Sequence, residues 1–525
     1  MKNKEAFSQK MNAFLFWCLV FIFVFRCIFP ENLFPQYFNS KPSEFSFLHP
    51  LFLGVHHFVG MVFTIILFLL FMINWFVTRK KIAELPLGNL IAAGLVWLML
   101  TAIGDIILSL SFKRFAFYLL NIAFMIYILY SYFARKDRKK LKFFFIIGTI
   151  LVISVVYFTI VSGHNLNREI CFQQIYYLIM TAVLLFFLTQ QIINSQKRIS
   201  LFLKIILFTG AFVALLGILE LIFKRNILYE KWFLIYHEIY IRRSSLIVMD
   251  ANLKPTGFYG RVFSTIGHPA YLSQFLIFPM FIGFYYLLKE GEWKKKISYA
   301  ISVILILFCM GITLTRASWL GSLAGIAGII LTSRFFIKNI RKIYIFAGLI
   351  LLSCIVLLSI PVIRKRVYSR LFVQIGTTSR AFGHRFQKFE SVKSIIRQKP
   401  FMGLGFGMYY FKYKDYLRQD QYYKDPTLDI VDNQYLELLC EIGLSGGIIL
   451  FLWILYNLSI IWNYSRYKKD LLLSCLFWGL VSFGISVAML GSFITWSSLL
   501  ATFTIYLGLA WKRIYYIERN ISLED

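Results

Sequence analysis

Apolar residues dominate the chain in long runs that short polar segments interrupt. A helix needs about 20 mainly apolar residues to cross a bilayer, and about fourteen runs approach that length. Their approximate limits are 11–29, 52–77, 88–111, 114–133, 142–162, 172–193, 202–223, 266–288, 297–314, 318–334, 342–361, 434–462, 470–490 and 492–511. The pattern predicts an all-α, polytopic membrane protein with about 14 (12–14) transmembrane helices.

The run 297–334 is too long for a single span. At about 1.5 Å per residue, one helix of that length would exceed the hydrocarbon core of roughly 30 Å. The polar segment 315–318, which contains Arg316, interrupts the run in its middle, so we expect two helices joined by a turn. Small residues lie on the second helix: Gly321, Ala324, Gly325 and Gly328. Because small side chains let helices approach closely, we expect them to fix this hairpin in place.

Basic residues alternate regularly between the predicted spans. With the N-terminus in the cytoplasm, every second connection is short and carries Lys or Arg, as 79–81 and 289–296 do. Cytoplasmic loops carry an excess of these residues. We therefore expect a multi-pass protein of the cytoplasmic membrane with both termini in the cytoplasm. The outer side then holds the loop 224–265, the turn at Arg316 and a long loop, 362–433.

Composition agrees with this class and changes the interpretation of the charge. The chain has 525 residues, of which 59% are hydrophobic, and a formal net charge of +31. Soluble domains average about 45–50% apolar residues. The basic residues lie mostly between apolar runs, where they orient spans and meet anionic lipid, so nucleic-acid binding is the weaker interpretation. We predict about seven spans and the first outer loop in 1–260, and a transmembrane core in 261–525.

Three residues on the predicted outer side are candidates for substrate binding. Arg316 lies near apolar surroundings, where an ionised side chain usually has a partner or a substrate. A fixed Arg suits phosphate recognition, whereas a mobile one anchors the chain at lipid headgroups. Arg261 has the same two interpretations. His268, directly before a proline, is either a cap or turn residue or a substrate contact.

The long loop 362–433 contains a basic amphipathic helix. Its apolar stripe consists of Phe382, Phe386, Phe389, Val392 and Ile396. Basic residues lie off the stripe (Arg385, Lys388, Lys393 and Arg397), and Arg380 precedes them. Such a helix either lies on the membrane surface or closes as a lid over an anionic headgroup. Gly403, Gly405 and Gly407 follow it and predict a tight turn that packs the loop on the spans.

The segment 432–443 re-enters the membrane after the loop. Asp432 at its start is either a helix cap, a role that Asn433 also suits, or a general base for a hydroxyl group. Glu441 lies deeper in the same predicted helix, where an acid needs a partner. We expect it to brace an Arg or a backbone group, and we expect a similar structural role for Asp105 and Glu220.

Four motifs in this order resemble the O-antigen ligase and O-antigen polymerase superfamily. They are Arg261…Gly267-His268-Pro269, Thr313-Leu-Thr-Arg316-Ala-Ser-Trp319, Lys399-Pro-Phe-Met-Gly-Leu-Gly-Phe-Gly407 and Asp432-Asn-x-Tyr-Leu-x-x-Leu-x-Glu441-x-Gly443. The resemblance covers roughly the C-terminal half of the chain. It implies an inverting glycosyltransferase without metal or cofactor. Such enzymes take a glycan from undecaprenyl pyrophosphate on the outer side of the cytoplasmic membrane.

The resemblance also implies partners and residue roles. Ligases pass the glycan to the lipid A core, polymerases join it to another glycan, and membrane lipid surrounds both. Arg261 and Arg316 match the family's arginines that hold the pyrophosphate, and we expect Asp432 to complete the catalytic set. Further substrate contacts are expected from Arg380, Arg385, Arg397, His268, Asn433 and Tyr435.

Two positions depart from the ligase pattern. Asp432 stands where ligases commonly have a His before the Asn, and Ala270 stands where an Asn often follows the His-Pro pair. The first departure favours a polymerase or another envelope glycan transferase, with Asp432 in place of the His as base. The alternative function is a lipid-linked oligosaccharide flippase or another polysaccharide transporter. A transporter is expected to show repeated halves and broken spans near the midplane.

Overall fold

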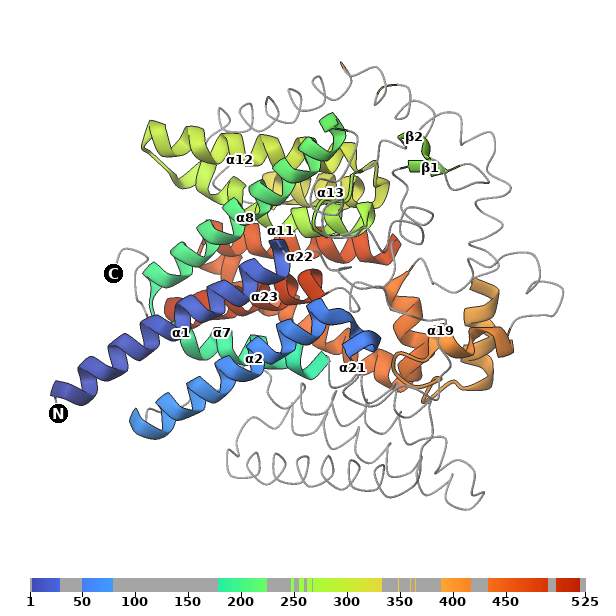
Figure 1. Cartoon of the computed structure of the whole chain (residues 1–525), viewed down its shortest axis with the longest axis horizontal. Helices are drawn as coiled ribbons and strands as arrows, with labels where there is room; N and C mark the ends of the chain where they lie inside the picture. Colours follow the sequence, from blue (N-terminus) through green and yellow to red (C-terminus); the bar gives the residue numbers. More distant parts are fainter. Residues whose placement is uncertain are drawn as a thin grey trace.

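The structure is a bundle of helices (Figure 1). This computed structural model describes residues 2–28, 50–78, 178–223, 247–249, 255–258, 262–266, 268–332, 389–416, 433–489 and 497–519, and the single residues 348, 359 and 364.

The described α-helices are α1 (Lys2–Ile28), α2 (Pro50–Thr78), α7 (Leu184–Ile192), α8 (Gln196–Phe223), α11 (Pro269–Lys289), α12 (Trp293–Ile312), α13 (Arg316–Thr332), α19 (Tyr409–Lys412), α21 (Gln434–Tyr467), α22 (Leu471–Met489) and α23 (Ser497–Glu518). A π-helical turn (Ile179–Val183) precedes α7, and a 3₁₀ turn (Tyr413–Tyr416) follows α19. Strands β1 (Ile247–Met249) and β2 (Pro255–Phe258) form a short antiparallel pair.

Helices occupy every predicted span that falls on the described segments. Within the described segments, six helices are long and apolar enough to cross a membrane: α1, α8, α11, α12, α21 and α22. The all-α class is confirmed for the described helical core, to which the pair of strands is a small addition. The predicted spans 88–111, 114–133 and 142–162 lie outside the described segments, and only residues 348 and 359 of 342–361 are described. The count of about 14 therefore stays a prediction.

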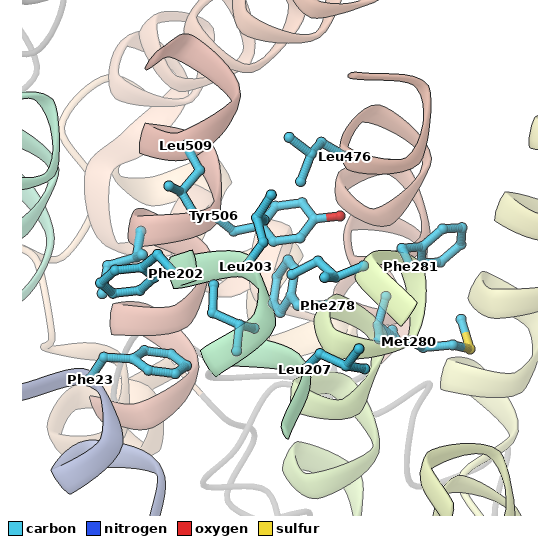
Figure 2. Close-up of a cluster of buried hydrophobic side chains, with 14 of the residues drawn as sticks. Phe23, Phe202, Leu203, Leu207, Phe278, Met280, Phe281, Leu476, Tyr506 and Leu509 are labelled. Carbon is cyan, nitrogen blue, oxygen red and sulfur yellow. The ribbon is translucent and has the colours of Figure 1, made fainter. Parts of the chain in front are cut away.

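Helix α11 lies at the centre of the bundle. All its residues from Pro269 to Leu288 are buried, whereas a helix at the surface of a bundle buries one stripe. Figure 2 shows Phe278 and Phe281 of α11 among apolar side chains of α8, α22 and α23. Tyr506 of α23 lies 4.8 Å from Phe278 between ring centroids. The rings leave no room for lipid around α11, so its neighbours fix its position.

Helix α13 packs on α22 along a stripe of glycines. A Cβ atom at Gly325 would collide with the Ser482 hydroxyl, and one at Gly328 would collide with the indole of Trp478. The glycines therefore allow the close approach that their spacing predicted. Their partner is α22, because α13 makes few contacts with its hairpin neighbour α12. Ala324 is exposed and takes no part in this stripe.

We expect Gly325→Val to destabilise the protein, because the added side chain has no space between α13 and α22. Overpacking a filled interior lowers stability by about 1–3 kcal/mol. Thermal unfolding of the detergent-purified protein should show a lower midpoint for this variant. Ala327→Val is the matched control, since it adds bulk at an exposed position of the same helix. An equal loss in both variants would contradict the close contact.

Candidate functional site

The turn between α12 and α13 presents Arg316. Helix α12 ends at Ile312 and α13 begins at Arg316, so the predicted interruption of this run is confirmed. Leu314 between them has a φ of 54°, a left-handed conformation that reverses the chain. Thr313 Oγ1 donates a hydrogen bond to Met310 O at 2.7 Å and holds the end of α12. Arg316 is exposed at the tip of a turn with a defined backbone.

The same turn rests on the beginning of α11. Thr315 Oγ1 donates a hydrogen bond to Pro269 O at 3.4 Å. His268 is the N-cap of α11, and its Nδ1 accepts a hydrogen bond from Ala270 N at 3.3 Å. The predicted capping role of His268 is confirmed, and its contact with substrate stays a prediction. The structure therefore brings His268 close to the turn that carries Arg316.

A buried carboxylate holds the segment that leads into α11. Glu220, near the end of α8, accepts hydrogen bonds through Oε2 from Phe263 N at 3.3 Å and Ser264 N at 2.8 Å. The predicted structural role of Glu220 as a brace is confirmed. Arg261 itself lies outside the described residues. The backbone of Phe263 and Ser264, which follows it, is fixed to α8.

Asn433 caps the beginning of α21. Its Oδ1 accepts hydrogen bonds from Tyr435 N at 3.0 Å and Leu436 N at 3.1 Å. Since Asn433 is the N-cap, the helix does not use Asp432 in that role. Asp432 lies outside the described residues, and its role as base stays a prediction.

Two contacts with α22 bring the beginnings of α13 and α21 to the same level. Tyr435 Oη donates a hydrogen bond to Gly484 O at 3.2 Å, and the hydroxyls of Ser318 and Ser486 are 2.9 Å apart. Gly484 and Ser486 are separated by about 3 Å along the helix axis. The beginnings of α11, α13 and α21 therefore lie at one end of the bundle, which we call the site end.

The glycine turn docks on a kink in α21. Gly443 has a φ of 67° and interrupts the helical conformation. In an unbroken helix Cys440 O would accept the N–H of residue 444; here both groups bond to the turn instead. The bonds are Leu404 N to Cys440 O (2.9 Å), Gly405 N to Glu441 O (3.0 Å) and Leu444 N to Pro400 O (2.7 Å). The glycines of the turn have φ values of 69° (Gly403), 101° (Gly405) and 77° (Gly407). The predicted tight turn that packs the loop on a span is confirmed.

The Glu441 carboxylate completes this junction. Glu441 is buried, and its Oε1 accepts a hydrogen bond from Tyr409 N at 3.2 Å. The N–H of Gly407 donates to the same carboxylate. The predicted brace to a backbone group is confirmed. Because the carboxylate is buried, these bonds supply the partners that the acid and the two amide groups need.

The predicted amphipathic helix is described over residues 389–398. Its buried face is centred on Val392 and Ile395. Phe389, which the spacing assigned to the apolar stripe, is 44% exposed, because the face turned to the protein lies beside that stripe. The basic residues Lys393 and Arg397 are exposed.

This helix is tied to the glycine turn. The hydroxyls of Ser391 and Tyr409 are 3.1 Å apart, and Tyr409 N also bonds to Glu441. The turn contacts α21 at residues 440–444, about 10–16 Å along the helix axis from Asn433. Arg397 therefore belongs to the same end of the bundle as the other described candidates.

Arg26 at the site end is not among the predicted residues. It is wholly buried in α1, and its guanidinium donates a hydrogen bond to Thr64 Oγ1 of α2 at 3.4 Å. The next carbonyl, Cys27 O, accepts a hydrogen bond from Thr265 Oγ1 at 2.7 Å. Arg26 thus lies beside the segment that leads into α11. A lone arginine within a Phe-rich run was the signal that could have identified it.

The described site residues gather at one end, and the others fall outside the described part of the chain. The described ones are Arg316, Arg397, His268, Asn433 and Tyr435; the others are Asp432, Arg261, Arg380 and Arg385, as is the brace candidate Asp105. Among described residues, no three His, Cys, Asp or Glu side chains group as metal ligands would.

We expect Glu441→Ala to release the glycine turn, since the Tyr409 amide would lose its acceptor. An unsatisfied buried group costs about 1–3 kcal/mol, so hydrogen exchange at this amide should accelerate roughly 5- to 150-fold. Glu441→Gln keeps an acceptor oxygen and should have a smaller effect. Glu437→Ala, one turn earlier, is the control; unchanged exchange in Glu441→Ala would refute the brace.

Comparison with known proteins identifies the region that carries this geometry. The family model Wzy_C, described as O-antigen ligase, matches residues 301–452. The matched range contains the Arg316 turn, the glycine turn, the Asn433 cap and the Gly443 kink. No curated protein matches the chain. Together with the six apolar helices, the match indicates a multi-pass membrane protein. The match to the O-antigen ligase domain supports membership of this chain in the O-antigen ligase superfamily.

Proposed function

We propose that the protein is an inverting, metal-independent glycosyltransferase of the cytoplasmic membrane. It takes a glycan from undecaprenyl pyrophosphate on the outer side and passes it to another glycan, as a polymerase, or to a lipid A core, as a ligase. The observation that carries the proposal is the position of Arg316. This exposed arginine begins a helix within the O-antigen ligase match, beside the beginnings of α11 and α21.

In the proposed reaction an acceptor hydroxyl attacks the anomeric carbon of the donor glycan. The new C–O bond forms as the bond to the pyrophosphate breaks, and the configuration at that carbon inverts. Asp432 accepts the hydroxyl proton. Arg261 and Arg316 stabilise the charge that develops on the departing pyrophosphate, because fixed donors act strongly where water is scarce. The Asn433 cap supports this role for Asp432, since α21 does not need its carboxylate as a cap.

The helix 389–398 serves as a lid in this proposal. Val392 and Ile395 are buried against the protein. This burial favours a lid rather than a helix that inserts into the membrane surface. Arg380, Arg385 and Arg397 would contact the anionic donor. The remaining substrate contacts would come from His268, Asn433 and Tyr435, in addition to the structural bonds that these three residues make.

The distribution of basic residues supports an outward-facing site. Lys294, Lys295 and Lys296 begin α12, and Lys468 and Lys469 follow the end of α21, so both groups lie opposite the site end. Short cytoplasmic segments are enriched in Lys and Arg. The site end then faces outward, with both termini in the cytoplasm.

We expect Arg316→Ala to reduce turnover about 10²- to 10³-fold, because one fixed donor to the leaving group is lost. The unfolding midpoint should not change, since Arg316 is exposed. The assay incubates purified protein in nanodiscs with an undecaprenyl-pyrophosphate-linked repeat unit. Longer glycans indicate a polymerase, and transfer to an added lipid A core indicates a ligase.

Arg466→Ala is the matched control, because it removes an exposed arginine at the opposite end of α21. Undiminished turnover by a folded Arg316→Ala protein would refute the pyrophosphate role. If the wild type forms no glycosidic bond but moves the donor across vesicles, the proposed chemistry is wrong and the chain is a transporter.

We expect Asp432→Ala and Asp432→Asn to abolish most glycan transfer, because both remove the base. Neither should lower the unfolding midpoint much, since Asn433 supplies the cap. Asn433→Ala is the contrasting variant and should lower stability by about 1 kcal/mol. Full transfer by Asp432→Ala would exclude the carboxylate as base.

A further inference from the structure

A cavity of about 200 Å³ lies at the end of the bundle opposite the site end. Its lining includes Ser200 and Lys204 of α8, Tyr285, Tyr286 and Lys289 of α11, and Leu472 of α22. The volume is several times the roughly 30 Å³ that one water occupies in the liquid. It is below the roughly 300–1,000 Å³ of pockets for drug-sized ligands. The cavity therefore suits a headgroup-sized fragment.

Three helices place this cavity about 20–30 Å from the candidate site along their axes. Helix α11 has 21 residues, or about 30 Å, which equals the hydrocarbon core; it begins at the site end and finishes beside the cavity at Lys289. Helix α22 runs the other way, from Leu472 at the cavity to Ser486 at the site end. On α8, Lys204 lines the cavity, whereas Glu220 holds the segment before α11. The cavity is thus independent of the proposed catalytic centre.

Aromatic residues indicate that the cavity lies at the level of the lipid headgroups. Tyr286 lies 5.0 Å from Tyr285 and 5.0 Å from Tyr299 of α12 between ring centroids. Trp293 at the beginning of α12 is 72% exposed. Tyr and Trp are enriched where the hydrocarbon core meets the headgroups. A ligand of this cavity would therefore be reached from the membrane interface.

The two lysines of the cavity are held over the tyrosine rings. Lys204 Nζ lies 5.6 Å from the ring centroid of Tyr286, and Lys289 Nζ lies 5.8 Å from that of Tyr285. Both lysines line the cavity. Glu290 also lines the cavity, but its Oε1 accepts the N–H groups of the following turn at 3.2 Å each. Positive charge therefore exceeds negative charge in the lining.

We propose that this cavity binds the phosphate headgroup of an anionic membrane lipid. Lys204 and Lys289 supply the charge. The Tyr286 hydroxyl donates a hydrogen bond to Ser200 O at 2.8 Å, so the Ser200 hydroxyl is the one of the pair that can donate to a bound phosphate. The acyl chains remain in the bilayer, which is consistent with the small volume. This lipid is distinct from the glycan donor, whose pyrophosphate is proposed to bind at the site end.

The test measures lipid binding by the full-length protein. Native mass spectrometry would follow titration of detergent-purified protein with phosphatidylglycerol, phosphatidylcholine or inorganic phosphate. The wild type should prefer phosphatidylglycerol. In Lys204→Gln/Lys289→Gln its affinity should fall about thirty-fold, since each basic residue near a lipid surface contributes roughly five-fold. Lys204→Arg/Lys289→Arg keeps both charges and should retain most of the binding.

Lys294→Gln/Lys296→Gln is the matched control, because it removes two lysines from the same end of the bundle but outside the cavity lining. It should bind phosphatidylglycerol as the wild type does. The proposal is overturned if the cavity variant keeps wild-type affinity with an unchanged unfolding midpoint, or if the control loses as much. It is also overturned if phosphatidylcholine binds equally well, or if millimolar phosphate displaces the lipid, which would assign the cavity to a soluble phosphate.

Discussion

The exchange of hydrogen bonds at the Gly443 kink is the constraint on which the candidate site depends. A span normally satisfies its backbone groups within itself, because lipid offers no partners. The kink diverts Leu444 N–H to Pro400 O, and Cys440 O accepts Leu404 N–H in return. The backbone polarity that the broken helix exposes is thus matched by the backbone of the glycine turn. The glycine turn is therefore attached to α21 through backbone N–H and C=O groups, and both segments need these groups to be paired.

The remaining contacts of the helix 389–398 follow from this junction. Glu441 lies just before the kink, and its carboxylate binds the amide of Tyr409. The Tyr409 side chain then meets Ser391 on the helix that presents Lys393 and Arg397. A buried acid is tolerated when several donors satisfy it, and here the donors come from the element that has to be positioned. One carboxylate therefore both satisfies the turn and sets the position of the basic helix.

The sequence predicted the structural roles of individual residues better than it predicted the groups and helices that these residues contact. A buried acid needs a partner, so a brace at Glu441 could be expected, but the donor lies 32 positions earlier in the chain and only the fold brings it close. The spacing of the glycines predicted which face of α13 another helix can pack against closely. It could not predict that this helix is α22. Asp432 and Asn433 both suit an N-cap; the geometry alone selects Asn433. Phe389 fitted the helical period but faces outward, since period defines a stripe and packing selects the buried face.

The described residues of the candidate site lie at the beginnings of helices, so their positions depend on how those helices pack in the core. His268, Arg316 and Asn433 each mark the beginning of a different helix. Sites on packed helices are held more closely than sites on loops, and electrostatic stabilisation of a leaving group requires donors that do not move. The relative position of these three residues is set by α22, which contacts α11, α13 and α21 along its length. Gly325, buried halfway along α13, thus helps to hold Arg316, because the depth at which α13 sits on α22 fixes where its first residue lies.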